Sequence, residues 1–292
     1  MKVFVITKKT IIRIAAAAAF LIAAIVLALV LKDGKNSDPQ GNTSAANDRV
    51  KAASSVKTDA GVLLSSDGMY EAEVLAGFNR ELPVYSVART DKKIALTIDA
   101  AWDDDKTPFI LETLDRYGIK ATFFLCGQWV KAYPDKVKLI HEAGHSIGNH
   151  SMTHPHMTKI DEAQIVKELT ELNDLIEKIT GERPTLFRAP FGEYNDKVIQ
   201  TVRNAGYEPI QWDVDTIDWK PERSSQTILD TVLPKLKDGS IILCHNNGFK
   251  IEEYLPTLIE TAQAQGFSFV TVDELLLKGD TVIDVNGVQK TA

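Results

Sequence analysis

From residue 91 to residue 277 the chain alternates short apolar runs with amphipathic stretches of helical period. One such stretch begins after Asp161, a helix-capping residue type, ends at Gly181, and carries a single apolar stripe. Repeated strand–helix units predict a parallel sheet covered by helices, either as a barrel or as an open doubly wound sheet. The runs that predict strands are, in order, KKIALTI, KATFFL, HSIGNH, PTLFRAP, YEPIQW, GSIILCH and FSFVTV.

Reactive side chains follow these apolar runs directly. In both arrangements of a parallel sheet, functional sites lie at the carboxyl ends of the strands. Scattered reactive residues would not coincide with those ends. The sequence therefore predicts one site that gathers Asp99, His150, Arg188, Asp215, Asp218 and His245.

The segment HSMTH places His150 and His154 four residues apart. On a turn or at the start of a helix, this spacing brings two imidazoles to one side, as metal chelation requires. An isolated pair with this spacing is more often two unrelated surface histidines. Here the pair follows a strand and shares the predicted strand-end site with Asp99 and His245, which favours a metal site. Two histidines and one carboxylate leave coordination positions open, as catalytic metal sites do.

Five segments occur in the order and approximate spacing of the motifs of a known family: TIDAAWDDD, HSMTH, RAPFG, DTIDW and LCH. Through them, residues 91–277 resemble polysaccharide deacetylases, the carbohydrate esterase family 4 or NodB-homology domain. The resemblance implies an α/β fold, a distorted (β/α) barrel with parallel strands. It also implies a divalent metal ion, zinc first and cobalt or another divalent ion as alternatives. The implied reaction is hydrolysis of N-acetyl groups from an amino-sugar polysaccharide such as peptidoglycan or chitin.

The resemblance also implies a role for individual positions. It makes Asp99 the general base, held ionised by Arg188. It makes His245 the general acid, tuned by Asp218. These roles suit amide hydrolysis, which needs a base for the water proton, an acid for the leaving amine and a metal to polarise the carbonyl. It makes His150 and His154 metal ligands and the backbone N–H of Phe191 an oxyanion donor, and it places Pro190 in the same substrate and oxyanion pocket. Trp219 and Leu243 would wall the part of the pocket that receives the acetyl methyl group.

One position departs from the family pattern. The family places a second aspartate, its third metal ligand, directly after the base, whereas this chain has Ala100 there. An aspartate of the run Asp103–Asp105 is one replacement, and we rank Asp104 first because a five-residue excursion could return it to the strand end. Alternatively, water completes the metal coordination, or the site binds metal weakly and the protein is a poor enzyme. If no acid of the run binds metal, the run is a solvated loop, as most charge runs are.

Residues 11–31, IIRIAAAAAFLIAAIVLALVL, form an apolar run with one charge near its start, long enough to span the roughly 30 Å of bilayer hydrocarbon. Basic residues precede the run, which places the N-terminus in the cytoplasm and the rest of the chain outside a single-pass anchor. A cleaved signal peptide is the alternative, but the run is long and lacks a small-residue cleavage site at its edge. Anchor and linker resemble those of wall-modifying and sporulation-associated family members.

We expect a basic cytoplasmic segment (1–10), a transmembrane anchor (11–31), a flexible polar linker (32–60), a segment leading into the domain (61–90), the deacetylase domain (91–277) and a C-terminal tail (278–292). A net charge of -7 without a dense basic cluster beyond the N-terminus argues against a nucleic-acid partner. Two function classes follow. One is a membrane-tethered deacetylase of an N-acetylated polysaccharide, and the other is a catalytically weak or inactive glycan-binding descendant of the same fold.

Overall fold

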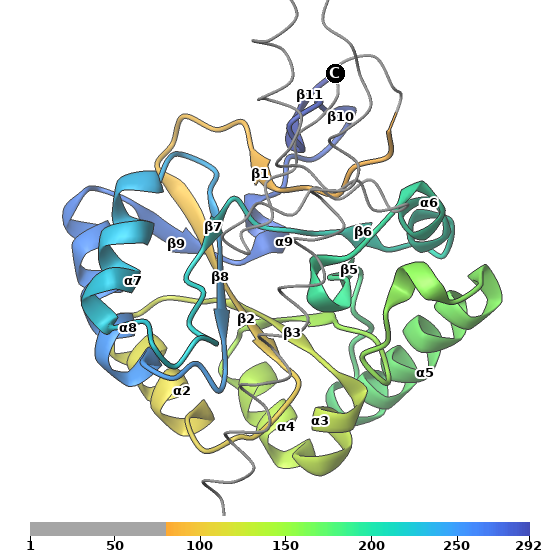
Figure 1. The fold of residues 1–292 in the computed structure, drawn as a ribbon, viewed down its shortest axis with the longest axis horizontal. Coiled ribbons are helices and arrows are strands. Elements are labelled where there is room, and N and C mark those ends of the chain that lie inside the picture. Colours follow the sequence, from red (N-terminus) through yellow and green to blue (C-terminus); the bar gives the residue numbers. More distant parts are fainter. Residues whose placement is uncertain (1–79) are drawn as a thin grey trace, which may run out of the picture. The chain divides into compact units, whose positions relative to one another are not determined.

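The computed structural model describes residues 80–292 (Figure 1). The predicted anchor over residues 11–31, the linker over 32–60 and most of the predicted lead-in segment lie outside these residues. Within residues 80–292, no helix is both long and apolar enough to cross a bilayer.

A parallel sheet carries the fold, as the alternating sequence pattern predicts. Its strands pair in the order β6-β5-β4-β3-β2-β8-β7, and β9 pairs with the start of β2. In residues 80–292 the end strands β6 and β7 are not paired with each other, so the sheet is a curled half-barrel instead of a closed barrel. The strands are β2 Lys93–Ala100, β3 Thr122–Leu125, β4 Ser146–Asn149, β5 Leu186–Phe187, β6 Glu208–Pro209, β7 Val214–Asp215, β8 Ile241–His245 and β9 Ser268–Val270.

Helices lie outside these strands (Figure 1). The longest, α5, begins where the Asp161 side chain accepts the N–H of Gln164 and ends at Gly181, whose φ of 80° suits the left-handed C-cap. Its buried apolar stripe faces the sheet, as predicted. The helices are α2 Thr107–Arg116, α3 Gly127–Ala132, α4 Pro134–Glu142, α5 Glu162–Thr180, α6 Asp196–Asn204, α7 Ser225–Val232, α8 Ile251–Ala264 and α9 Val272–Leu275.

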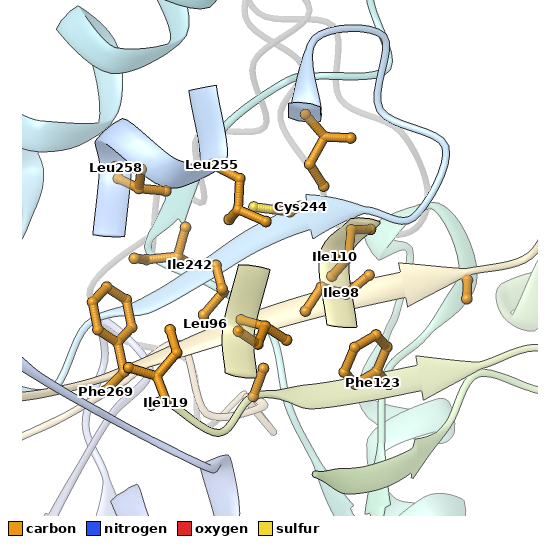
Figure 2. Close-up of a cluster of buried hydrophobic side chains, with 14 of the residues drawn as sticks. Leu96, Ile98, Ile110, Ile119, Phe123, Ile242, Cys244, Leu255, Leu258 and Phe269 are labelled. Carbon is orange, nitrogen blue, oxygen red and sulfur yellow. The ribbon is translucent and has the colours of Figure 1, made fainter. Parts of the chain in front are cut away.

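Strand β2 divides its side chains between two environments. Leu96, Ile98 and Ala100 belong to the main hydrophobic core, which helices α2 and α8 cover. Figure 2 shows Leu96 and Ile98 among side chains of this core. Because strand side chains alternate, Thr97 and Asp99 face the opposite side of the sheet, inside the curl. There both side chains bond to Arg188.

The C-terminal residues, predicted as a tail, form part of a small second sheet. Strands β10 (Thr281–Ile283) and β11 (Val288–Thr291) pair in antiparallel fashion, and β11 pairs with β1 (Ser86–Val87). The turn between β10 and β11 is held by Asp284, whose side chain accepts the N–H groups of Asn286 and Val288. Residues from both ends of the described chain therefore complete one sheet.

Candidate active site

A pocket of about 370 Å³ opens at the carboxyl ends of the strands. Strands β2 and β8 contribute Asp99 and His245, which are direct partners in the parallel register. The pocket contains most of the predicted site residues, so sequences far apart along the chain do meet at one place. Its walls are formed by Asp99, Ala101, Trp102, His150, His154, Phe191, Gly192, Trp212, Asp215, Trp219, Leu243, His245 and Asn247.

Arg188 fixes the charge of Asp99. The guanidinium is fully buried and donates to Asp99 Oδ1 and to Thr97 Oγ1, each at 2.8 Å. The Phe124 ring lies against it at 4.1 Å, measured from the guanidinium carbon to the ring centroid. Burial raises the pKa of Asp99, but the charge of Arg188 and its hydrogen bond, with the charge of His245, outweigh burial and lower it below its usual range. The carboxylate is therefore ionised, with one oxygen held and the other open to the pocket.

His150 and His154 lie together as neutral imidazoles. The Nδ1–H of His150 donates to the carbonyl of Arg188 at 2.9 Å, so its Nε2 carries the lone pair and lies 3.7 Å from Asp99 Oδ2. The two imidazole centroids are 5.0 Å apart. Burial lowers the pKa of His150, and burial together with His150 lowers the pKa of His154 to about 3. Neutral imidazole is the form that binds metal ions.

Asp218 holds His245 in the protonated, positively charged form. Its Nδ1–H donates to Asp218 Oδ1 at 2.7 Å, while the backbone N–H of His245 and the hydroxyl of Tyr254 donate to Oδ2 at 3.0 and 2.7 Å. Burial lowers the pKa of His245, but the charge and hydrogen bond of Asp218 outweigh burial and raise it to about 9. A Cβ at Gly248 would overlap the Asp218 carboxylate, so only glycine allows this close approach.

The RAPFG segment turns sharply after β5. Phe191 has a φ of 61° inside the short helix Pro190–Gly192, and its ring is 41% exposed at the pocket wall. Pro190 is buried in this turn and is not part of the pocket wall. Trp219 and Leu243 do line the pocket, as predicted.

The structure does not bring Asp104 to the two histidines, contrary to the prediction that it replaces the missing ligand. Side-chain donors hold the backbone of the loop instead: Asn246 Nδ2 donates to the carbonyls of Trp102 and Asp103, and Trp129 Nε1 donates to that of Asp103 at 2.6 Å. The carbonyl of Asp104 accepts the N–H that starts α2. From this loop it is the ring of Trp102 that lies against His154, with centroids 4.7 Å apart, and the Phe191 ring lies against it at 4.6 Å.

The donor set suits a divalent metal only in part. Two neutral imidazoles match such an ion, but across residues 80–292 no three His, Cys, Asp or Glu side chains are arranged to hold one. Ala100 supplies no carboxylate at this position, and its side chain faces the hydrophobic core, on the side of β2 opposite to Asp99.

Sequence reasoning missed two residues that bond to the partners of His245 and Asp99. Tyr254 stands in the apolar stripe of α8, where nothing indicated that its hydroxyl reaches Asp218. Thr97, which bonds to Arg188, could have been found, since it is a polar residue between Leu96 and Ile98 on the side of β2 that carries Asp99.

A family model described as polysaccharide deacetylase matches residues 86–210. The peptidoglycan-N-acetylmuramic acid deacetylase PdaA of Bacillus subtilis is 32% identical over 64% of this chain and 73% of its own length. This chain belongs to the polysaccharide deacetylase family. The crystal structure of PdaA, a family 4 carbohydrate esterase, superposes with a TM-score of 0.63 at 31% identity, over 66% of this chain and 84% of that one.

Two other family members bear on activity. The peptidoglycan-N-acetylglucosamine deacetylase PgdA of Listeria monocytogenes is 37% identical over 67% of this chain, but the match spans only 41% of that longer protein. A family 4 pseudoenzyme from Bacillus anthracis superposes with a TM-score of 0.64 at 35% identity, over 67% of this chain and 69% of that one. The polysaccharide deacetylase family thus includes enzymes and a pseudoenzyme at similar distances from this chain.

Proposed function

We propose that this protein is a metal-dependent N-deacetylase of an amino-sugar polysaccharide. The observation that carries the proposal is the opposite charge of two neighbouring strand-end residues, an ionised Asp99 and a His245 whose pKa is raised to about 9. Titratable groups that their surroundings drive apart in one pocket are the mark of an acid and base pair. Amide hydrolysis requires both.

In the proposed reaction, Asp99 accepts a proton from the attacking water, whose oxygen bonds to the acetyl carbonyl carbon. Arg188 keeps the carboxylate ionised until that transfer. His245 then gives its Nε2 proton to the sugar nitrogen as the carbon–nitrogen bond breaks, which releases acetate and the free amine. Asp218 stabilises the imidazolium beforehand and holds its ring in place.

His150 and His154 would hold the metal ion, with zinc as the first candidate. When bound, a divalent metal would polarise the acetyl carbonyl and acidify water. The chain brings no third protein ligand to these imidazoles in residues 80–292, so water would complete the coordination. His150 is oriented for this role by its hydrogen bond to the Arg188 carbonyl, which fixes the tautomer with a free Nε2.

The pocket mouth suits a sugar substrate. Trp102, Phe191 and Trp219 line it and are 54%, 41% and 49% exposed. Exposed aromatic faces beside a polar pocket offer platforms on which the apolar face of a pyranose ring can stack. Leu243 forms part of the wall that would receive the acetyl methyl group. Peptidoglycan is the substrate class we favour, since PgdA and PdaA are peptidoglycan deacetylases.

We further propose that residues 11–31 anchor the protein in the cell membrane and that the catalytic domain is extracytoplasmic, where peptidoglycan lies. The apolar run and the basic residues before it support this placement. A role in wall modification or sporulation is a related proposal, based on the anchor and linker. Protease treatment of intact, wall-stripped cells tests the topology: digestion of the domain is expected, and full protection would contradict it.

Ala100 supports a second candidate function, a weak or inactive glycan-binding descendant of the fold. The buried alanine removes a ligand that the family pattern supplies, and a pseudoenzyme lies among the relatives. One experiment separates the candidates. Purified full-length protein is assayed for metal content and for acetate release from an N-acetylglucosamine oligomer, with Asp99→Asn as control. Acetate release that depends on Asp99 supports the deacetylase, whereas glycan binding without metal or acetate supports the descendant.

A further inference from the structure

The turn that carries His154 adopts an unfavourable backbone conformation. Ser151 and His154 have φ values of 65° and 59°, in the left-handed region that residues with a Cβ avoid. Each such residue costs of the order of 1 kcal/mol, so other contacts must maintain the turn. The conformation matters because it sets where the His154 imidazole lies relative to that of His150, 5.0 Å away.

A buried carboxylate on the neighbouring helix binds the middle of this turn. Glu168 of α5 is 4% exposed. Its Oε2 accepts the backbone N–H of Thr153 at 2.7 Å, and its Oε1 accepts the Thr153 hydroxyl at 2.8 Å. The N–H belongs to the Met152–Thr153 peptide, so the two bonds fix the residue that directly precedes His154.

Hydrogen bonds between residues close in sequence complete the arrangement. Asn149 Oδ1 accepts the N–H of Ser151 at 2.9 Å, and Ser151 Oγ accepts the N–H of His154 at 3.0 Å. These contacts come from the turn and the strand before it. Glu168 ties the same turn to a separate, rigid element.

We propose that Glu168 is a positioning residue that holds His154 beside His150 as a metal-binding pair. The inference rests on the proposed function, which supplies zinc as the ion that the two histidines bind. Both carboxylate oxygens accept from Thr153, so Glu168 acts through geometry. A glutamine can reproduce it, because its carbonyl accepts the N–H while its amide donates to the threonine hydroxyl.

The experiment uses full-length protein and Zn²⁺ alone as probe, with binding measured by competition against a chromophoric chelator. Glu168→Ala should weaken zinc binding 10- to 100-fold, the usual range for residues that orient metal ligands. Glu168→Gln should stay within about threefold of wild type. Thr153→Val removes only the hydroxyl bond, so its zinc affinity should lie between those of Glu168→Ala and Glu168→Gln. It replaces Glu168→Ala as the test if that variant does not fold. His154→Ala, which lacks one of the two imidazoles, should show the weakest zinc binding of the series.

A matched variant separates positioning from general stability. Leu172→Val lies on the same helix but faces the hydrophobic core, so it should lower the melting temperature without changing zinc affinity. Equal zinc affinity in wild type and in Glu168→Ala would overturn the inference. The inference would also be overturned if Leu172→Val and Glu168→Ala lost zinc affinity in the same proportion to their loss of stability.

A second readout needs no metal. In zinc-free protein, amide hydrogen exchange at Thr153 should speed up at least tenfold in Glu168→Ala and remain near wild type in Glu168→Gln, because only the former loses the acceptor. Unchanged exchange in Glu168→Ala would overturn the inference. If wild type binds no zinc, the proposed metal dependence fails, and this exchange measurement still decides whether Glu168 fixes the turn.

Discussion

Replacing Asp218 by asparagine should move the titration of His245 by more than two pH units. The carboxylate is the main reason that the His245 pKa lies at about 9, and burial alone would lower it below the ordinary value of 6.5. At about 1.4 kcal/mol per unit, the carboxylate therefore stabilises the imidazolium by roughly 3 kcal/mol. At pH 7.5 the protonated fraction should fall from about 97% to about 10% or less, given these pKa values.

The asparagine should keep the local structure. Its carbonyl oxygen can accept from the Tyr254 hydroxyl and from the His245 backbone N–H, as Asp218 Oδ2 does. Its amide can donate to His245 Nδ1, which leaves a neutral ring with the proton on Nε2. The change therefore tests charge with little alteration of shape.

The His245 titration is measured by NMR in the metal-free protein, through its Cε1–H resonance, so the result does not depend on activity. The pH profile of acetate release is the second assay. Loss of the acid form should lower turnover at pH 7.5 about tenfold or more, and the alkaline limb should move from about 9 to below 6.5. A His245 pKa that stays near 9 in Asp218→Asn would refute the assignment of Asp218 as the cause.

The same pair makes stability depend on pH. A group whose pKa is raised in the folded state contributes stability that is fully present below its unfolded pKa, near 6.5, and lost as pH rises through about 9. Wild type should therefore lose up to about 3 kcal/mol of unfolding free energy across this window, measured by urea denaturation. Asp218→Asn should lack that loss, and an equal loss in both proteins would assign it to other groups.

Four further changes test the remaining site. Asp99→Asn and His245→Ala should each lower turnover about 100-fold or more while metal content stays near wild type, and an unchanged acetate-release rate would remove that residue from the reaction. Asp104→Ala should change zinc affinity and turnover by less than about twofold, because Asp104 lies outside the pocket; a large loss of bound zinc would restore it as a ligand. Ala100→Asp should destabilise the zinc-free protein by roughly 2–4 kcal/mol, since a carboxylate would enter the core, and zinc should not recover the loss in a thermal melt because position 100 faces away from the pocket. Recovery by zinc would show that a carboxylate at position 100 can reach the metal.

The sequence alone was sufficient to predict the parallel sheet and the place of its site. Short apolar strands separated by amphipathic helices have few compact solutions, and all place strand ends along one edge. Asp99, His150 and His245 lie at strand ends and line one pocket, where Arg188, which follows β5, bonds to Asp99, so their meeting follows from that rule. The helix from Asp161 to Gly181 was equally predictable, because both ends and the apolar stripe are local signals.

Only the tertiary structure decided which neighbours surround those residues. Strand alternation directs Ala100 into the core. Side-chain hydrogen bonds from Asn246 and Trp129 to loop carbonyls hold the acidic loop so that Trp102, not Asp104, lies against His154. The Glu168 and Tyr254 side chains reach the site from helices whose sequence patterns look like ordinary packing or solvent faces. Such contacts depend on the angle and distance between elements remote in the chain, which local periodicity does not encode. The charge of His245 belongs to the same class, since it arises from a carboxylate 27 residues away that folding brings within 2.7 Å.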